Sequence, residues 1–454
     1  MSALVKKSVR HTLWGMAFPM LAGTFAMNAY NLTDTWFVSR LGTLPLAAMG
    51  YTFPVVMLLT CVAGGIGTGI TTLVSHAIGR QAHDDAARVV THGLALMLGV
   101  STAMTVAGYL SIEAVFTRLG AEGATLELVG QYMRTWYVGA PTMALPMVGN
   151  GILISCGDSR AASRFMILGT VLNAILDPIM IFGFAGFPAM GMRGAALATV
   201  LSQAVSTVWL LALLGRKHRL LAFRHGLPPG FPASVRRILG FAIPSVLSMI
   251  LMPVSASVIT RIVAGYGVAA VAACGAAGRI EHVAFVIPMA LGISLTPFVS
   301  QNFGAQRLDR IGEAMRISTR FALAYGGAVT AVFFLCAPWL ARVFSKDPAV
   351  IAILVTYIRI ISFGYGMMEV HRYCGFFLTG MHRPVSTTLL NAIRILAFLI
   401  PLSWLGSELY GVHGIFWGRL ATDLCVGCIG LFWAHRAVAN ATALMPPAAV
   451  RETA

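Results

Sequence analysis

Five carboxylates interrupt the long apolar runs of this 454-residue chain, and they are the residues whose type and placement could do chemistry. They are Asp34, Asp177, Glu281, Glu369 and Asp423. A charged side chain at the centre of a membrane-spanning helix costs at least about 2.5–3.5 kcal/mol. An acid there is therefore expected to have a partner or a function, and such acids commonly serve ion pathways and proton relays.

Two of these acids, Asp34 and Asp177, have polar companions on the same helix face. Tyr30 precedes Asp34 by four residues and Asn173 precedes Asp177 by four, which is the spacing of neighbours on one side of an α-helix. From a rise of about 1.5 Å per residue, Asp34 is expected about 33 Å and Asp177 about 24 Å along their helices from the same membrane side. Both therefore belong in the outer half of the N-terminal lobe.

A carboxylate pair without a cation in a low-dielectric medium is suited to ion exchange. Repulsion between the two charges favours uptake of a proton, or of Na⁺ with Asn and Tyr oxygens as further ligands. A structural alternative stays open, in which either acid caps or braces a helix bend. Pro178 directly follows Asp177 and removes a backbone donor, so a bend is expected there.

The acids of the second half have basic neighbours in the sequence. Glu281 lies beside Arg279 and His282, and both structural ion pairing and substrate contact are open for it. Glu369 is followed by His371 and Arg372, and a role in binding cationic substrates or in proton coupling is open beside a structural one.

Asp423 and three methionines complete the candidates. Arg419 precedes Asp423 by four residues, which predicts a local structural pair. Flexible methionines suit a cavity that accepts varied amphiphiles. The candidates on the expected cavity-lining helices are Met27, Met252 and Met289.

Composition places the chain in a membrane. Its residues are 57% hydrophobic and only 11% charged, where a soluble protein carries about 25% charged residues. Apolar runs of helical length recur from Leu13 to Trp433, which predicts a polytopic α-helical protein rather than a β-barrel. No Walker P-loop GxxxxGK[ST] is present, so ATP drive is not expected. An enzyme would need a clustered catalytic set at one membrane interface, and the sequence has none, so enzyme chemistry is not expected.

Breaks between the apolar runs predict an all-α polytopic fold with twelve transmembrane helices. The expected helices are 12–38, 46–76, 91–117, 126–155, 161–186, 191–215, 236–264, 269–301, 317–343, 350–379, 386–406 and 411–435. They group into an N-lobe at 1–215, a cytoplasmic linker at 216–235, a C-lobe at 236–436 and a cytoplasmic tail at 437–454.

The basic residues predict the orientation. Of the 32 Lys and Arg, 20 fall on the side of the N-terminus, five on the other side and seven within helices. This bias predicts that both termini and the linker are cytoplasmic, in a bacterial inner membrane. It also accounts for the net charge of +16 without a nucleic-acid partner.

The two halves are repeats of one another. A shift of 225 residues gives 16 identities over Gly15–Gln81, among them Pro19 with Pro244 and Gly42 with Gly267. Six helices per half is an even number, so the repeats are parallel, and a central cavity between two six-helix lobes is expected. This is a transporter architecture.

Several motifs, taken in order, resemble the multidrug and toxic compound extrusion (MATE) transporters. They are "NLTDTWFVSRLGTLPLAAMG", "GTGITTLVSHAIGRQ", "GNGILISCGDSR", "VLNAILDPIMIFG" and "GISLTPFVSQNFGAQ", and the likeness covers about residues 10–435. The DinF-like branch is the nearest in pattern. The resemblance implies an N-lobe cation site at Asp34 and Asp177, with polar positions Tyr30, Asn150, Asn173 and Thr199 around it. The helix 10 acid of another branch resembles Glu369, but the helix 7 carboxylate of that branch has no counterpart here.

These observations predict a secondary antiporter that exports amphiphilic or cationic compounds, driven by inward H⁺ or Na⁺ movement. No cofactor, and no metal beyond Na⁺ at Asp34 and Asp177, is expected. The expected partners are small substrates and the bilayer, and the chain is expected to be a monomer. The alternative is a lipid-linked oligosaccharide flippase of the same superfamily, and an integral-membrane enzyme is the second rival.

Overall fold

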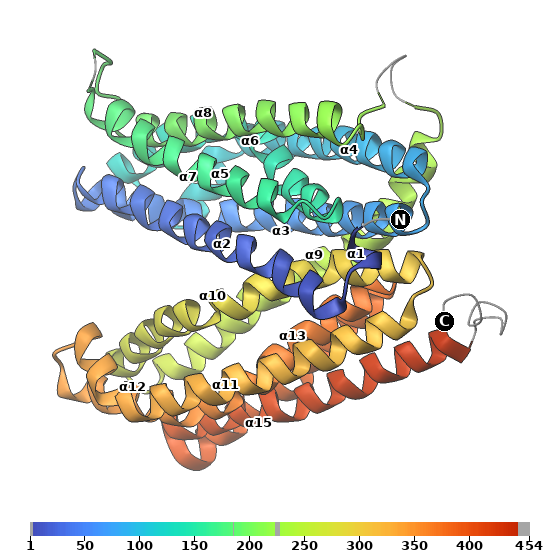
Figure 1. Ribbon diagram of the computed structural model, residues 1–454. Coiled ribbons are helices and arrows are strands. Elements are labelled where there is room, and N and C mark those ends of the chain that lie inside the picture. Colours follow the sequence, from blue (N-terminus) through green and yellow to red (C-terminus); the bar gives the residue numbers. More distant parts are fainter. Residues whose placement is uncertain (1–2, 185, 223–227, 444–454) are drawn as a thin grey trace. The chain divides into compact units, whose positions relative to one another are not determined.

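The computed structural model describes residues 3–184, 186–222 and 228–443, and within these ranges every regular element is a helix (Figure 1). In the first half they are α1 (Ala3–Lys6), α2 (Val9–Ser39), α3 (Thr43–Gly79), α4 (His83–Leu110), α5 (Ile112–Arg118), α6 (Gly123–Ser155), α7 (Ser159–Phe182), α8 (Gly191–Ala212) and the π-helix η1 (Leu213–Lys217). In the second half they are α9 (Phe231–Ala264), α10 (Val268–Gly304), α11 (Leu308–Phe344), α12 (Pro348–Ile361), the 3₁₀ turn η2 (Ser362–Gly364), α13 (Tyr365–Gly380), α14 (Pro384–Ala392), the π-helix η3 (Ile393–Leu399) and α15 (Ile400–Ala443).

Ten segments of the described ranges are long and apolar enough to cross a membrane. One of them, Pro384–Ala443, has non-helical backbone at Tyr410 and Gly411 and so contains two helices joined by a kink. The 31-residue α2 coincides with the first predicted span. The described residues thus provide the twelve long helical stretches that the sequence predicts.

Two helices begin eight or nine residues earlier than predicted. α4 starts at His83 rather than at 91, and α11 starts at Leu308 rather than at 317. Both added turns are charged, with acids in the first turn of each helix. A prediction based on apolar runs omits such turns, although acids at a helix N-terminus stabilise it through the helix dipole.

The repeat is confirmed by the backbone. α3 and α10 are both 37 residues long, and their bounds are related by the same shift of 225 residues. Gly42 and Gly267 precede these helices with φ of 116° and 95°, and Gln81 and Gln306 follow them with φ of 63° and 58°. Matched left-handed positions at both ends show that the two halves share one local fold.

The chain divides into two compact units, one from Met16 to Val246 and one combining Ala3–Gly15 with the residues from Leu247 onward. In the first unit α6 packs against α3, α4 and α8, and α7 packs against α8 (Figure 1). In the second unit α13 packs against α10, α11 and α15. Each unit has its own apolar core, around Phe116 and Met133 in the first and around Tyr365 and Phe416 in the second. The lobe, linker and tail boundaries stay a prediction.

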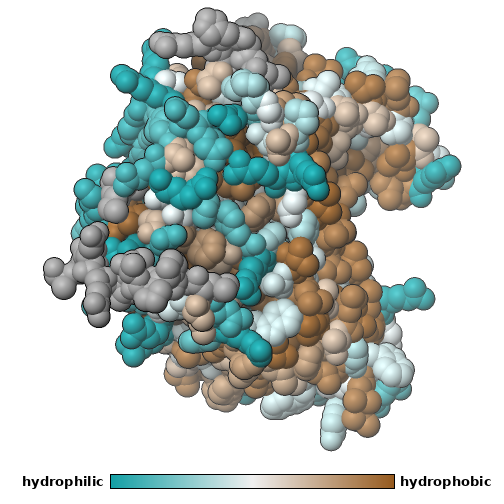
Figure 2. Space-filling model, turned by 90° about the vertical axis from the view of Figure 1, so that its right-hand side faces the viewer, coloured by the Kyte–Doolittle hydropathy of each residue, from teal (hydrophilic) through white to brown (hydrophobic). Residues whose placement is uncertain are grey.

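The surface of the chain shows the division of polarity expected of a membrane protein. In Figure 2 hydrophilic residues gather on one part of the face in view, and hydrophobic residues cover the adjoining parts. Many large apolar side chains are exposed on the long helices, including Leu110, Val208, Leu335 and Val268. Such a surface is stable in contact with lipid.

Candidate ion-binding site

Asp34 and Asp177 are both buried within the first unit. Asp34 lies on α2 with 6% of its surface exposed, and Asp177 lies on α7 and is fully buried. The side-chain amide of Asn173 donates a hydrogen bond to Asp177 Oδ1 at 3.1 Å, as the i,i+4 spacing predicts. One oxygen of each acid, Asp34 Oδ1 and Asp177 Oδ2, is buried without a hydrogen-bond partner.

Tyr30 connects α2 to α8 beside these acids. Its hydroxyl donates to Thr199 Oγ1 at 3.0 Å and also interacts with the side chain of Gln203. The charges of Asp34 and Asp177 both act on the Tyr30 hydroxyl, and the charge of Asp34 acts on Asp177. The structure therefore gathers Tyr30 and Thr199 with the two acids, on three helices.

No basic side chain neutralises this pair among the described residues. Each of the nine ion pairs found there involves other acids. A buried carboxylate without a cation or a full set of donors is unfavourable while ionised, so it takes up a proton or a cation. The two unpartnered oxygens, with the oxygens of Asn173 and Tyr30 near them, are a donor set that suits H⁺ or Na⁺.

α2 and α7 contact one another directly. Thr170 Oγ1 donates to the carbonyl of Ala26 at 3.1 Å, and a Cβ added to Gly23 would lie 2.8 Å from Met166 Sδ. Pro178 lies inside α7, directly after Asp177, and α7 ends at the left-handed Gly183. The proline leaves the carbonyl of Ala174 without its helical donor, which weakens the helix next to the acid.

Asn150 does not join this cluster. Its amide donates to Met166 Sδ at 3.6 Å. Met166 precedes Asp177 by eleven residues on α7, or about 16 Å along the helix axis. Asn150 Oδ1 is itself buried without a hydrogen-bond partner. No contact between Asn150 and either acid is present in the described residues.

Glu281 forms a buried ion pair in the second unit. Arg419 Nη2 lies 2.9 Å from Glu281 Oε2, and the hydroxyls of Tyr357 and Tyr365 donate to Glu281 Oε1 at 3.0 and 3.3 Å. Arg419 also donates to the hydroxyl of Tyr357. Of the two roles left open by the sequence, structural pairing is the one that these contacts support.

The predicted pairing of Asp423 with Arg419 is wrong. Asp423 Oδ1 instead accepts from Arg394 Nη2 at 2.9 Å, while Arg419 is engaged by Glu281. Arg394 lies in the π-helix η3, whose wider turn changes the direction of its side chains relative to an α-helix. A partner on another helix therefore replaces the local one.

Glu369 is almost fully buried on α13, with Arg372 Nη1 at 3.2 Å. The charge of Arg394 also acts on it. His371 on the same helix contacts the Asn391 amide oxygen through Nε2 at 2.9 Å. Glu369, unlike Asp34 and Asp177, is thus surrounded by cationic side chains.

The three methionine candidates are exposed within their own units. Their exposed fractions are 54% for Met27 on α2, 59% for Met252 on α9 and 42% for Met289 on α10. Their role in substrate contact stays a prediction.

The sequence interpretation missed Gln203 and Arg394. Gln203 follows Thr199 by four residues on α8, so the i,i+4 rule used for the acids would have found it. Arg394 follows Asn391 within a segment predicted to be regular α-helix, and no sequence signal marks the π-helical turn.

Comparison with known proteins places these features in a family. The MatE family description matches residues 19–179 and again residues 244–405. The chain belongs to the MATE family. The two matches begin 225 residues apart, which is the shift that relates the two halves, so the internal duplication is a property of this MATE protein.

Relatives cover nearly all of the chain. A "FAD transporter" of Shewanella oneidensis is 35% identical over 434 residues, covering 95% of this chain and 96% of the relative. The "Multidrug export protein MepA" of Staphylococcus haemolyticus is 23% identical and covers 94% and 93%. The bent form of the Vibrio cholerae MATE transporter VcmN has a TM-score of 0.91 at 26% identity and covers 96% of this chain and 99% of that one. This MATE protein is thus a multi-pass membrane transporter of small organic substrates and not an enzyme.

Proposed function

We propose that this MATE protein is a secondary antiporter that exports amphiphilic, often cationic, compounds and takes up H⁺ or Na⁺ through Asp34 and Asp177. The observation that carries the proposal is the buried pair of acids, each with one oxygen lacking a partner and neither with a basic neighbour in the described part of the chain. The export of drugs by family relatives such as MepA supports the substrate class.

The coupling step follows from the electrostatics of the pair. With both acids ionised, two negative charges repel one another in a low-dielectric environment and attract a cationic substrate. Uptake of H⁺ or Na⁺ removes that attraction and allows α2 and α7 to pack more closely. The weakened turn at Pro178 is where α7 can adjust its direction. Ion uptake and substrate release are thereby linked.

Exchanging each acid for its neutral isostere tests the coupling. Asp34→Asn and Asp177→Asn are expected to abolish dye efflux driven by an imposed gradient in proteoliposomes. Asp84→Asn, which changes an exposed acid in the first turn of α4, is the control and is expected to retain efflux. Separate pH and Na⁺ gradients identify the ion. Normal export by both of the first two variants would overturn the proposal.

A flavin dinucleotide is a second candidate substrate, and one observation favours it. The FAD transporter of Shewanella oneidensis is the relative with 35% identity along nearly the whole chain. Proteoliposomes loaded with FAD test it directly through the fluorescence of the released flavin. Release that depends on the gradient and is lost in Asp34→Asn would support flavin export. Dye export without flavin release would exclude FAD and leave drugs as the single candidate substrate class. The flippase alternative stays a prediction.

A further inference from the structure

The first half of α9 presents two faces with different surroundings. One face packs tightly on α3: a Cβ added to Gly65 would lie 2.9 Å from the Ala242 carbonyl, and one added to Gly69 would lie 2.8 Å from the Ile238 carbonyl. Such close backbone approach requires glycine on α3. It fixes the rotation of α9 and turns its opposite face away from α3.

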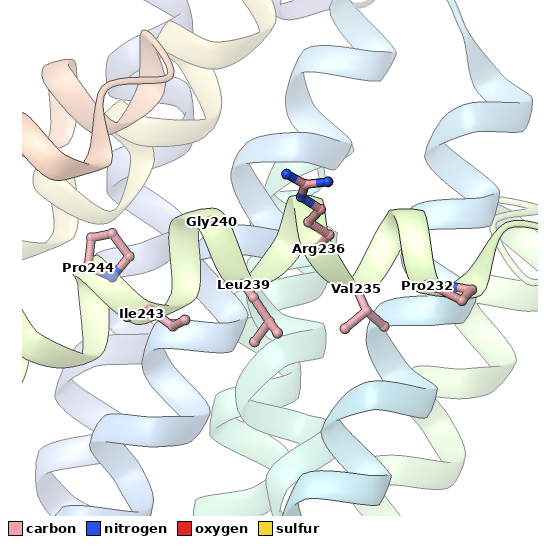
Figure 3. A pocket seen from close by; sticks show the side chains of 7 residues that line it. All are labelled: Pro232, Val235, Arg236, Leu239, Gly240, Ile243 and Pro244. Carbon is pink, nitrogen blue, oxygen red and sulfur yellow. The ribbon is translucent and has the colours of Figure 1, made fainter.

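That opposite face forms a groove of about 590 Å³ (Figure 3). Its lining residues recur at intervals of three and four along α9: Pro232, Val235, Arg236, Leu239, Gly240, Ile243 and Pro244. The side chains are apolar except for Arg236, which extends away from Val235 and Leu239 in Figure 3. No atom lies within 4 Å of a Cβ added to Gly240, so the middle of the groove is open.

Two adjacent arginines differ in their partners. Arg237 Nη1 lies 3.2 Å from Asp85 Oδ1, and Asp85 also pairs with Arg80 at 3.2 Å. Arg236 is exposed, and no acid of the described chain pairs with it. The groove therefore carries one available positive charge, near the start of α9, followed by an apolar floor.

We propose that this groove binds an anionic phospholipid, with the phosphate at Arg236 and an acyl chain along Leu239, Gly240 and Ile243. The charge at one end matches an anionic headgroup, which a basic residue near the membrane surface attracts. The distance from Arg236 to Pro244 is about 12 Å along the helix, which fits within the roughly 15 Å thickness of one apolar leaflet. The start of α9 belongs to one unit and its end to the other. A lipid in this groove would therefore contact the helix that connects the two units in the chain.

Native mass spectrometry of the purified protein with phosphatidylglycerol or phosphatidylcholine tests this site. The wild-type protein is expected to retain phosphatidylglycerol in preference to phosphatidylcholine. Arg236→Ala is expected to weaken phosphatidylglycerol binding about fivefold, the effect of about one surface charge, and to leave phosphatidylcholine unchanged. Gly240→Leu, which fills open space on a helix, is expected to weaken both lipids.

Two controls distinguish binding in the groove from a general attraction of anionic lipid to basic residues. Arg320→Ala removes another exposed arginine, on α11, and is expected to bind both lipids as the wild type does. Thermal unfolding of Gly240→Leu without lipid checks that the variant is folded. Equal phosphatidylglycerol affinity in the wild type and Arg236→Ala would overturn the proposal. Displacement of phosphatidylglycerol by inorganic phosphate at the same concentration would also overturn it, because the site would then bind a free anion and not a lipid.

Discussion

The two halves of this MATE protein share one duplicated frame but treat their buried acids in opposite ways. In the first unit Asp34 and Asp177 lie together without a cation. In the second, Glu281 is paired with Arg419, and Asp423 with Arg394. A buried acid that contacts an arginine is held in a structural ion pair, whereas a buried acid without a cation can bind and release ions. The duplicated fold thus places buried acids in both halves. Whether an arginine contacts an acid decides if that acid is structural or can bind ions.

Removing one member of a fixed pair is expected to have the largest effect on stability. Glu281→Gln leaves Arg419 as an uncompensated charge and should lower the free energy of unfolding by about 3–5 kcal/mol. The double variant Glu281→Leu with Arg419→Met should recover most of that loss, because it removes both charges. Unfolding followed by denaturant titration of the detergent-solubilised protein measures both. If the double variant lost as much free energy of unfolding as the single one, altered packing and not an unpaired charge would be the cause of the instability.

The partner of Asp423 is tested by a double-mutant cycle. The hydrogen-bonded contact at 2.9 Å predicts a coupling energy of about 1.5–3 kcal/mol between Asp423→Asn and Arg394→Leu. Asp423→Asn and Arg419→Leu should couple by less than about 0.5 kcal/mol, because Arg419 is directed to Glu281. The reverse order of the two couplings would restore the local i−4 pairing predicted from the sequence.

This second half shows where sequence reasoning fails. Local spacing found the contact of Asn173 with Asp177 because both lie on one regular helix. It assigned Asp423 to Arg419 because the two residues are four apart, and it did not consider a partner on another helical segment such as Arg394 in η3. Glu281 and Arg419 are separated by 138 residues, and only tertiary packing brings them together. The twelve helices were predictable because they follow from apolar runs, and the repeat because identical residues recur at a constant shift of 225. The charged first turns, such as that of α4, were missed because they are not apolar.

A third group of charges lies outside the membrane spans and is sensitive to pH. Burial lowers the pKa of His218 despite the nearby Asp158 charge. Burial opposes ionisation of Asp158, but hydrogen bonds from Lys217 and the Ala161 N–H outweigh it and hold the pKa of Asp158 below its ordinary value. Both pKa values are thus lower in the folded state, so the unfolded state binds more protons as pH falls and stability decreases.

The expected change is small and begins with His218. The free energy of unfolding, measured by thermal denaturation, should be lower at pH 5 than at pH 7.5 by about 0.2–1 kcal/mol, because free histidine titrates near 6.5. Asp158 contributes only below its free value of about 3.9. His218→Gln should flatten the dependence between pH 7.5 and 5, with His11→Gln, an exposed histidine, as the control. Stability that rises on acidification would contradict the sign.

The smallest expected effect on stability belongs to the residue with the largest expected effect on transport. Asp34→Asn keeps the side-chain shape and removes a charge that has no basic partner in the described structure, so the free energy of unfolding should change by less than about 0.5 kcal/mol or rise slightly. Repulsion of Asp177 is removed at the same time. Denaturant titration beside gradient-driven efflux, with Glu281→Gln measured in parallel, separates the two properties. If Asp34→Asn were as unstable as Glu281→Gln, Asp34 would be holding a structural partner, and the contrast between a fixed and an exchangeable half would not stand.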